Sequence, residues 1–264
     1  MSEASDLFGA VATAYARHRL TYPAPFFEAF TARLGHGARV WDCGCGSGQA
    51  ALDLAERGLQ VIATDASAAQ LAAGRPHPLI EYRLAPAEAS GLESASVDGV
   101  LVAAAVHWFD AEAFNAEVRR VARPGALLAW IGYLPLQIPD ARLQSTLEQF
   151  RTVVLRPWWA PECDWVEQRY AGLAFPGLEE PFLQGLWIER HWRLSDLLGH
   201  IGTWSALQRS RHQGLELLEP LEAALGRQWP GQGSTPLPLR WPFMGRWGRV
   251  DPAGDGAGGP GPMR

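Results

Sequence analysis

The sequence contains only three cysteines, Cys43, Cys45 and Cys163, and it lacks a long uncharged apolar run. The longest uncharged stretch, between Arg123 and Asp140, is interrupted by proline and glycine and is shorter than the roughly 18 residues of a membrane span. The first residues have no apolar core of the kind that a secretory signal peptide needs. An odd number of cysteines without such a signal is typical of a reducing compartment, so we expect a cytoplasmic protein that does not associate with membranes.

The sequence also lacks an excess of positive charge and a cluster of metal-ligating residues, and each absence makes one class of function less favoured. The formal net charge is −5 and the pI is about 5.8. Nucleic-acid binding depends on clustered Lys and Arg that neutralise phosphates, so we expect no nucleic-acid partner. Cys43 and Cys45 are close in sequence, but no His/Cys pair elsewhere matches them. We therefore predict small turn residues there and no metal site.

Residues 36–133 alternate between short apolar segments and helical ones, beginning after a first helix over 23–34. We expect strands over 38–43, 60–64, 81–85, 97–105 and 126–131, with helices over 50–57, 67–73 and 110–122. This alternation is typical of right-handed crossovers and a parallel sheet covered by helices. The prediction is a doubly wound α/β fold, in which ligands bind beyond the carboxyl ends of the strands.

The second half of the chain carries most of the 12 tryptophans. We expect helices over 142–155, 196–208 and 215–225, strands over 186–194 and 238–250, and a Trp- and Pro-rich loop or cap over 156–182. Pro242 predicts that the last strand is broken or lies at an edge. We assign residues 1–250 to one domain, with a core over 36–133 and the cap and final strands over 134–250. A disordered Gly/Pro-rich tail is expected over 251–264.

The strongest chemical signal is the turn after the first predicted strand, which ends at Asp42 and leads into Gly44, Gly46 and Gly48. Glycines let a backbone turn sharply and approach a ligand closely, and the following helix presents unpaired N–H groups. The spacing also fits, less well, the Gly-x-Gly-x-x-Gly/Ala pattern of dinucleotide sites. Asp42 favours S-adenosylmethionine over a dinucleotide as the ligand. A carboxylate would repel the pyrophosphate of a dinucleotide, but it suits the ammonium group of S-adenosylmethionine.

Acidic residues also follow the next two strands. Asp65 ends the second, where a carboxylate can accept hydrogen bonds from both ribose hydroxyls. Because dinucleotide enzymes share this feature, Asp65 indicates a ribose rather than a particular cofactor, and a helix cap is its alternative role. Ala87 and Glu88 follow the third strand, where the carboxylate could hold an adenine amino group or be a solvated loop acid.

Together these motifs resemble the class I S-adenosylmethionine-dependent methyltransferases, and more narrowly their trans-aconitate methyltransferase-like (type 11) branch. The resemblance covers roughly residues 7–250 and rests on the segments 15–17, 22–23, 42–49, 65–67, 85–88, 105–109 and 202–205. Two departures are Cys45, where related loops often have Thr or Ser, and the single glycine after Arg123-Pro124.

The resemblance implies a seven-stranded, mostly parallel sheet with an antiparallel edge strand, and S-adenosylmethionine as the cofactor. It implies that Gly44 and Gly46 pack on the methionine part, that Asp65 holds the ribose, and that Glu88 with Ala87 reads the adenine. A lid is expected around Tyr15. The residues we assign to the cofactor are Tyr15, Asp42, Gly44, Gly46, Gly48, Gln49, Asp65, Ala66, Ala87, Glu88, Ala104 and Trp108.

We predict a small-molecule methyl acceptor, a carboxylate, hydroxyl or amine, bound near Trp108 and Phe109 after the fourth strand. His107 is a weak candidate for the catalytic base, and a buried structural histidine is its alternative role. A carboxylate acceptor would instead need an arginine clamp. The candidates for the clamp are Arg17, Arg19 and Arg193, and those for an apolar acceptor pocket are Trp158, Trp159, Trp192 and Trp204. Two alternative functions are a non-catalytic S-adenosylmethionine-binding protein and an NAD-dependent oxidoreductase. We expect a monomer or a homodimer.

Overall fold

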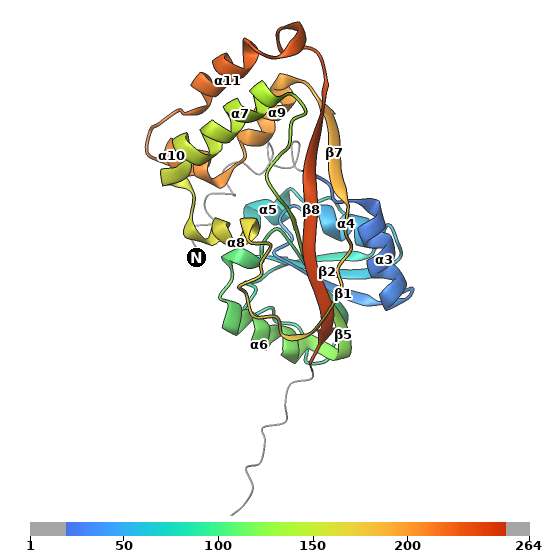
Figure 1. The fold of residues 1–264 in the computed structure, drawn as a ribbon. Helices are drawn as coiled ribbons and strands as arrows, with labels where there is room; N and C mark the ends of the chain where they lie inside the picture. Colours follow the sequence, from blue (N-terminus) through green and yellow to red (C-terminus); the bar gives the residue numbers. More distant parts are fainter. Residues whose placement is uncertain (1–19, 252–264) are drawn as a thin grey trace, which may run out of the picture.

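An eight-stranded sheet organises residues 20–251, the part of the chain that the computed structural model describes (Figure 1). Seven strands lie in the order β3-β2-β1-β4-β5-β8-β6, and β7 pairs with β8 outside this path. The strands are β1 (Arg39–Cys43), β2 (Gln60–Asp65), β3 (Ile80–Leu84), β4 (Val97–Ala103), β5 (Ala122–Tyr133), β6 (Gly177–Glu180), β7 (Trp187–Trp192) and β8 (Leu237–Val250). Strands β1 to β5 pair in parallel, which confirms the doubly wound α/β prediction.

Two apolar layers form because alternate residues of each central strand face opposite sides of the sheet. In β1, Val40 packs with the layer of α3 and α4, whereas Trp41 packs with the layer of α6, and both side chains are fully buried. The helices of this half are α3 (Ala24–Leu34), α4 (Gln49–Ala55), α5 (Ala68–Ala72) and α6 (Ala111–Val121). The layers hold the carboxyl ends of β1 to β4 at one edge of the sheet, where the predicted site lies.

The second half adds helices at the end of the molecule where the upper part of β8 extends (Figure 1). They are α7 (Ala141–Gln149), α9 (Leu194–Ile201), α10 (Ser205–His212) and α11 (Leu218–Gly226), whereas the short helix α8 (Asp164–Glu167) lies lower, between this group and α6 in the view of Figure 1. Leucines of α7, α9 and α11 share a buried cluster with Leu239 and Trp241 of β8. The strand β8 therefore belongs both to the sheet and to the helical cap.

The last strand differs from the prediction, because β8 runs unbroken for 14 residues through Pro242. A proline removes a hydrogen-bond donor from a sheet, so it is tolerated where pairing changes. Pairing with β7 ends at Pro242, opposite Trp187, and pairing with β5 begins at Phe243, opposite Tyr133. The expected antiparallel edge strand is also corrected: β8 is antiparallel to β5 but lies second from the end, and β6 takes the edge.

The helix predicted over 196–208 is wrong in its extent, because α9 ends at Ile201 and α10 begins at Ser205. The Thr203 hydroxyl donates to the carbonyl of His200 at 2.7 Å, so it competes with the helical hydrogen bond. The expected cap over 156–182 contains short helical turns and the strand β6. The predicted tail beyond Asp251 lies outside the described residues, as do Tyr15, Arg17 and Arg19.

Candidate active site

The glycine turn after β1 has a left-handed backbone at Gly46 (φ +56°) and Gly48 (φ +78°). A Cβ atom at Gly48 would overlap the side chain of Tyr82, so this glycine serves close packing inside the protein. A Cβ atom at Gly46 would meet nothing nearer than the Gln70 Oε1 atom at 3.8 Å. Gly46 therefore presents bare backbone to an open space, which leaves room for a ligand.

Asp65, at the end of β2, ties its own turn to the glycine turn. Its Oδ2 atom accepts from the Gly46 N–H at 2.8 Å, and its Oδ1 atom accepts from the Ser67 N–H at 2.8 Å. Burial raises the pKa of Asp65, and the two N–H groups oppose that rise. Each carboxylate oxygen has a further lone pair, so Asp65 can still accept two hydroxyl hydrogen bonds from a ligand.

Asp42, in β1, is a buried acid without an ion-pair partner among the described residues. Its side chain is fully buried, and neither oxygen accepts a hydrogen bond of ordinary geometry from the described residues. Burial raises the pKa of Asp42 to about 7, although the nearby N–H of Ala51 lowers it in part. The carboxylate is close enough to Cys45 in the glycine turn to raise the pKa of that thiol, but it is not part of the cavity wall.

Near Ala87 the cavity wall includes one acidic residue, Glu88, and one exposed apolar residue, Leu84. The Glu88 Oε1 atom accepts from the backbone N–H of Asp110 at 2.9 Å, and Asp110 in turn caps α6. Leu84, the last residue of β3, is 62 % exposed although it is apolar. An exposed apolar side chain beside a cavity is suited to the flat face of a base. Sequence reasoning missed Leu84, because nothing in the sequence distinguishes it from a core leucine.

The carboxyl end of β4 leads into a backbone outlier and a short 3₁₀ turn. Ala104 has φ +54°, and its N–H donates to the carbonyl of Ile131 at 2.8 Å. The turn then spans Val106–Trp108 and brings the His107 and Trp108 rings to a centroid distance of 4.8 Å. The cavity wall thus includes His107 and Trp108, on the side where an acceptor would approach.

These features share one cavity of about 990 Å³, a size suited to a cofactor together with a small acceptor. Nine of the predicted residues line it: Gly44, Gly46, Asp65, Ala66, Ala87, Glu88, Ala104, His107 and Trp108. Asp42, Gly48 and Gln49 are not among its lining residues; the Gln49 amide instead donates to the Ser47 hydroxyl at 2.9 Å. Of the predicted aromatic cap, Trp159 and Trp204 line the cavity, whereas Trp158 and Trp192 do not.

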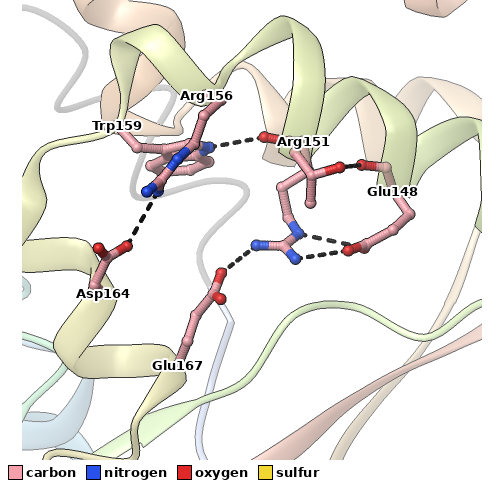
Figure 2. A network of polar contacts seen from close by, with 7 residues as sticks. Glu148, Arg151, Arg156, Trp159, Asp164 and Glu167 are labelled. Atoms are coloured by element: carbon pink, nitrogen blue, oxygen red, sulfur yellow. Dashed lines mark hydrogen bonds and ion pairs between the residues drawn. The ribbon is translucent and has the colours of Figure 1, made fainter.

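A network of charged side chains forms the far wall, on α7, on the π-helical turn after it and on α8 (Figure 2). Arg151 donates to Glu148 at 2.7 Å and also pairs with Glu167, while Arg156 contacts Asp164 at 3.3 Å. Burial alone would lower the pKa of Arg151, but the two glutamates raise it, so the guanidinium is firmly charged. Both arginines in this wall already have acidic partners.

Sequence reasoning did not find the far wall of the cavity. The missed lining residues include Arg151, Tyr170, His200 and Trp241, which come from four separate segments. Arg193, a predicted carboxylate clamp, caps α9 and is not among the lining residues. No motif marks the missed positions, because only the fold brings them together.

Comparisons with known proteins agree with this geometry. The methyltransferase-domain family profile matches residues 41–130. A solved structure assigned as a type II methyltransferase from Anaeromyxobacter dehalogenans is 38 % identical with a TM-score of 0.78, and the match covers 89 % of this chain and 99 % of that one. A protein assigned as a methyltransferase from Dictyostelium discoideum is 29 % identical over 76 % of this chain and 77 % of its own length. An uncharacterised methyltransferase from Mycobacterium tuberculosis is 41 % identical over 47 % of this chain and 51 % of its own.

The chain belongs to the class I S-adenosylmethionine-dependent methyltransferases. It is therefore an enzyme that uses S-adenosylmethionine, as predicted, and not the NAD-dependent alternative. None of the described helices is both long enough and apolar enough to cross a membrane.

Proposed function

We propose that the enzyme methylates a hydroxyl or amine group of a small, partly aromatic molecule. The observation that carries this proposal is the charge of the cavity wall. Among the described residues that line the cavity, the acidic ones outnumber the arginines. The acids are Asp65, Glu88, Glu148, Asp164 and Glu167, and the arginines are Arg151 and Arg156. A carboxylate acceptor would enter a negative cavity in which both arginines are already paired, so its desolvation would be poorly compensated.

The cofactor half of the cavity fits S-adenosylmethionine in three respects. Gly46 leaves open space beside bare backbone, Asp65 has lone pairs for two ribose hydroxyls, and Leu84 offers an apolar face for the adenine. When ionised, Asp42 adds a negative charge close to the turn, which favours an ammonium group in the cavity, and such a group would in turn favour the ionised form. In this proposal Gly44, Gly46 and Asp65 hold the cofactor, and Ala87 and Glu88 read the adenine; the assignment of Tyr15 to the cofactor stays an expectation from the sequence.

When bound, S-adenosylmethionine supplies an electrophilic methyl group on a sulfonium centre. The chain contributes alignment, because an acceptor held between the aromatic wall and the end of β4 loses little further entropy on reaction. Trp108 and Trp159 exclude water from that space. His107 is the proposed proton acceptor for a hydroxyl or amine, since imidazole exchanges protons near neutrality and His107 lines the cavity.

The test is a screen for release of S-adenosylhomocysteine with three matched sets of small molecules: carboxylates, phenols or alcohols, and amines. We expect product with the second or third set. Product with carboxylates only would overturn the assignment of acceptor class. Cofactor binding without product in any set would mean that the acceptor lies outside all three classes, which would also overturn the proposal.

A glycine pair supplies the control for the cofactor site. Gly46→Arg places a long side chain in the cavity, and we expect it to abolish cofactor binding. Gly91→Arg is matched, because Gly91 also has a left-handed backbone (φ +70°) and open surroundings but is not among the lining residues. Cofactor binding by calorimetry should survive in Gly91→Arg; survival in Gly46→Arg would mean that the cofactor lies elsewhere.

Three further assignments belong to this proposal. Membership of the trans-aconitate methyltransferase-like branch rests on the same segments as the family resemblance, 15–17, 22–23, 42–49, 65–67, 85–88, 105–109 and 202–205, and concerns ancestry rather than the acceptor. A single domain over 1–250 is supported by β8, which pairs with β5, β6 and β7. A monomer or homodimer is our expectation for the assembly, and sedimentation velocity of the purified chain tests it.

A further inference from the structure

The loop between α8 and β6 contains two consecutive residues with a left-handed backbone, and neither is glycine. Arg169 has φ +55° and Tyr170 has φ +61°. Such conformations cost about 1–3 kcal/mol each, and they persist only where the surrounding structure imposes them. Arg169 is exposed, whereas Tyr170 is fully buried and lies in the cavity wall. Strain of this kind gathers at functional positions, so the role of Tyr170 requires an explanation.

The strained turn inserts the Tyr170 ring between β5 and the His107 turn. The planes of the Tyr170 and His107 rings are 15° from parallel, and their centroids are 6.2 Å apart. The Tyr170 hydroxyl lies against β5, where a Cβ atom on Gly132 would come within 2.7 Å of it. Because the Trp108 ring is also near the His107 ring, two aromatic rings border the imidazole.

Arg246 of β8 holds the strained turn in place. Its Nη1 atom donates to the carbonyl of Tyr170 at 2.6 Å and to that of Leu173 at 2.7 Å. Its Nε atom donates to Glu179 at 2.8 Å, and its guanidinium carbon lies 5.2 Å from the centroid of the Trp130 ring. Trp130 pairs with Arg246 in the register of β5 and β8, so the sheet fixes the position of the Arg246 backbone. A planar five-donor group is required for such a set of bonds.

We propose that Tyr170 and Arg246 are positioning residues, which fix the imidazole of His107 toward the acceptor. Arg246 clamps the turn, the turn presents the Tyr170 ring, and that ring limits the orientations of His107. The inference rests on the proposed role of His107 as proton acceptor. It adds two residues, from outside the cofactor motifs, on which the geometry of that step depends.

The orientation of His107 is tested by its imidazole NMR signals, which need no acceptor. The chain has seven histidines, and His107→Gln identifies the signal of interest. We expect Arg246→Lys and Tyr170→Leu to shift this signal, whereas Tyr170→Phe, which keeps the ring, leaves it nearly in place. The matched control is Arg240→Lys on the same strand, since Arg240 forms a surface pair with Glu189 at 2.8 Å and does not line the cavity. An unmoved His107 signal in both folded Arg246→Lys and folded Tyr170→Leu would overturn the proposal.

The second part of the test measures kcat of the same variants with the acceptor that gives most product in the screen. We expect kcat of Arg246→Lys to fall about tenfold or more, because a misplaced proton acceptor loses much of its effect. Affinity for S-adenosylhomocysteine should change less than twofold, and Tyr170→Phe should keep most of kcat. A loss of affinity equal to the loss of kcat would overturn the positioning role. If the His107 signals move as expected but His107→Gln retains full kcat, the proton-acceptor proposal fails and the positional coupling stands.

Discussion

The buried carboxylate of Asp42 predicts an unusual pH dependence of stability, which Asp42→Asn should reveal. A pKa raised from 3.8 to about 7 means that the unfolded chain releases this proton earlier than the folded one as pH rises. Folding therefore loses stability as pH rises between about 4 and 7, and the loss is complete above 7. At about 1.4 kcal/mol for each pH unit, the full cost approaches about 4 kcal/mol at pH 8 and is below about 2 kcal/mol at pH 5.

Asparagine has the shape of the protonated acid and cannot ionise, so Asp42→Asn should escape this cost. Without cofactor, we expect the variant to be more stable than the parent chain by up to about 4 kcal/mol at pH 8 and by much less at pH 5. The same variant should bind S-adenosylmethionine more weakly, because the charge close to the glycine turn is lost. Urea unfolding at the two pH values, with calorimetry of cofactor binding, measures both effects.

Asp98→Asn supplies a control of opposite sign. Burial alone would raise the pKa of Asp98, but the backbone N–H of Arg39 and the side chain of Arg123 lower it. Its ionised form therefore stabilises the fold above pH 4, and the variant should lose stability at pH 8. If Asp42→Asn were destabilising at pH 8, or if its effect were equal at both pH values, the reasoning about Asp42 would be refuted.

Three other variants test the remaining geometry. Asp65→Ala should weaken cofactor binding by about 1–3 kcal/mol through loss of charge-assisted hydrogen bonds, and an unchanged Kd in calorimetry would place the ribose elsewhere. Arg169→Gly should raise the melting temperature, because glycine accepts φ +55° without strain; a lower melting temperature would contradict the strain argument. Gly132→Ala should destabilise the fold by about 1–3 kcal/mol, because the new methyl group would crowd the Tyr170 hydroxyl and Met244; unaltered urea unfolding would contradict that contact.

Sequence reasoning worked well where neighbouring residues in the chain are also neighbours in the site. The turn from Asp42 to Gly48 is local, and so is the run from Ala85 to Glu88, so their spacing alone predicts where each strand ends. The first five strands follow the expected alternation because both faces of each are determined by nearby helices. Local pattern is thus sufficient for the fold of the first half and for the strand ends that line one side of the cavity.

The acceptor side depends on contacts between distant segments and could not be predicted in the same way. Tyr170 and Arg246 are 76 positions apart, and only the pairing of β8 with β5 brings them together. Pro242 suggested a broken strand, because a sequence cannot show that two different partners meet at that position. The end of α9 at Ile201 likewise depends on a hydroxyl of Thr203 that single-residue propensity does not weigh.

The chain makes two excursions between β5 and β8, first over 134–176 and again, after β6, over 181–236, where β7 pairs with β8 outside the main strand order. The first excursion joins β5 to β6, which lie on either side of β8, and the second joins β6 to its neighbour β8, so the ends of both are anchored in the sheet. The first excursion carries Arg151 and Tyr170 and the second carries His200, whereas the methyl-donor edge belongs to neither. Under the proposed function, substrate preference would therefore be encoded in these two excursions, separately from the strand ends that recognise the donor.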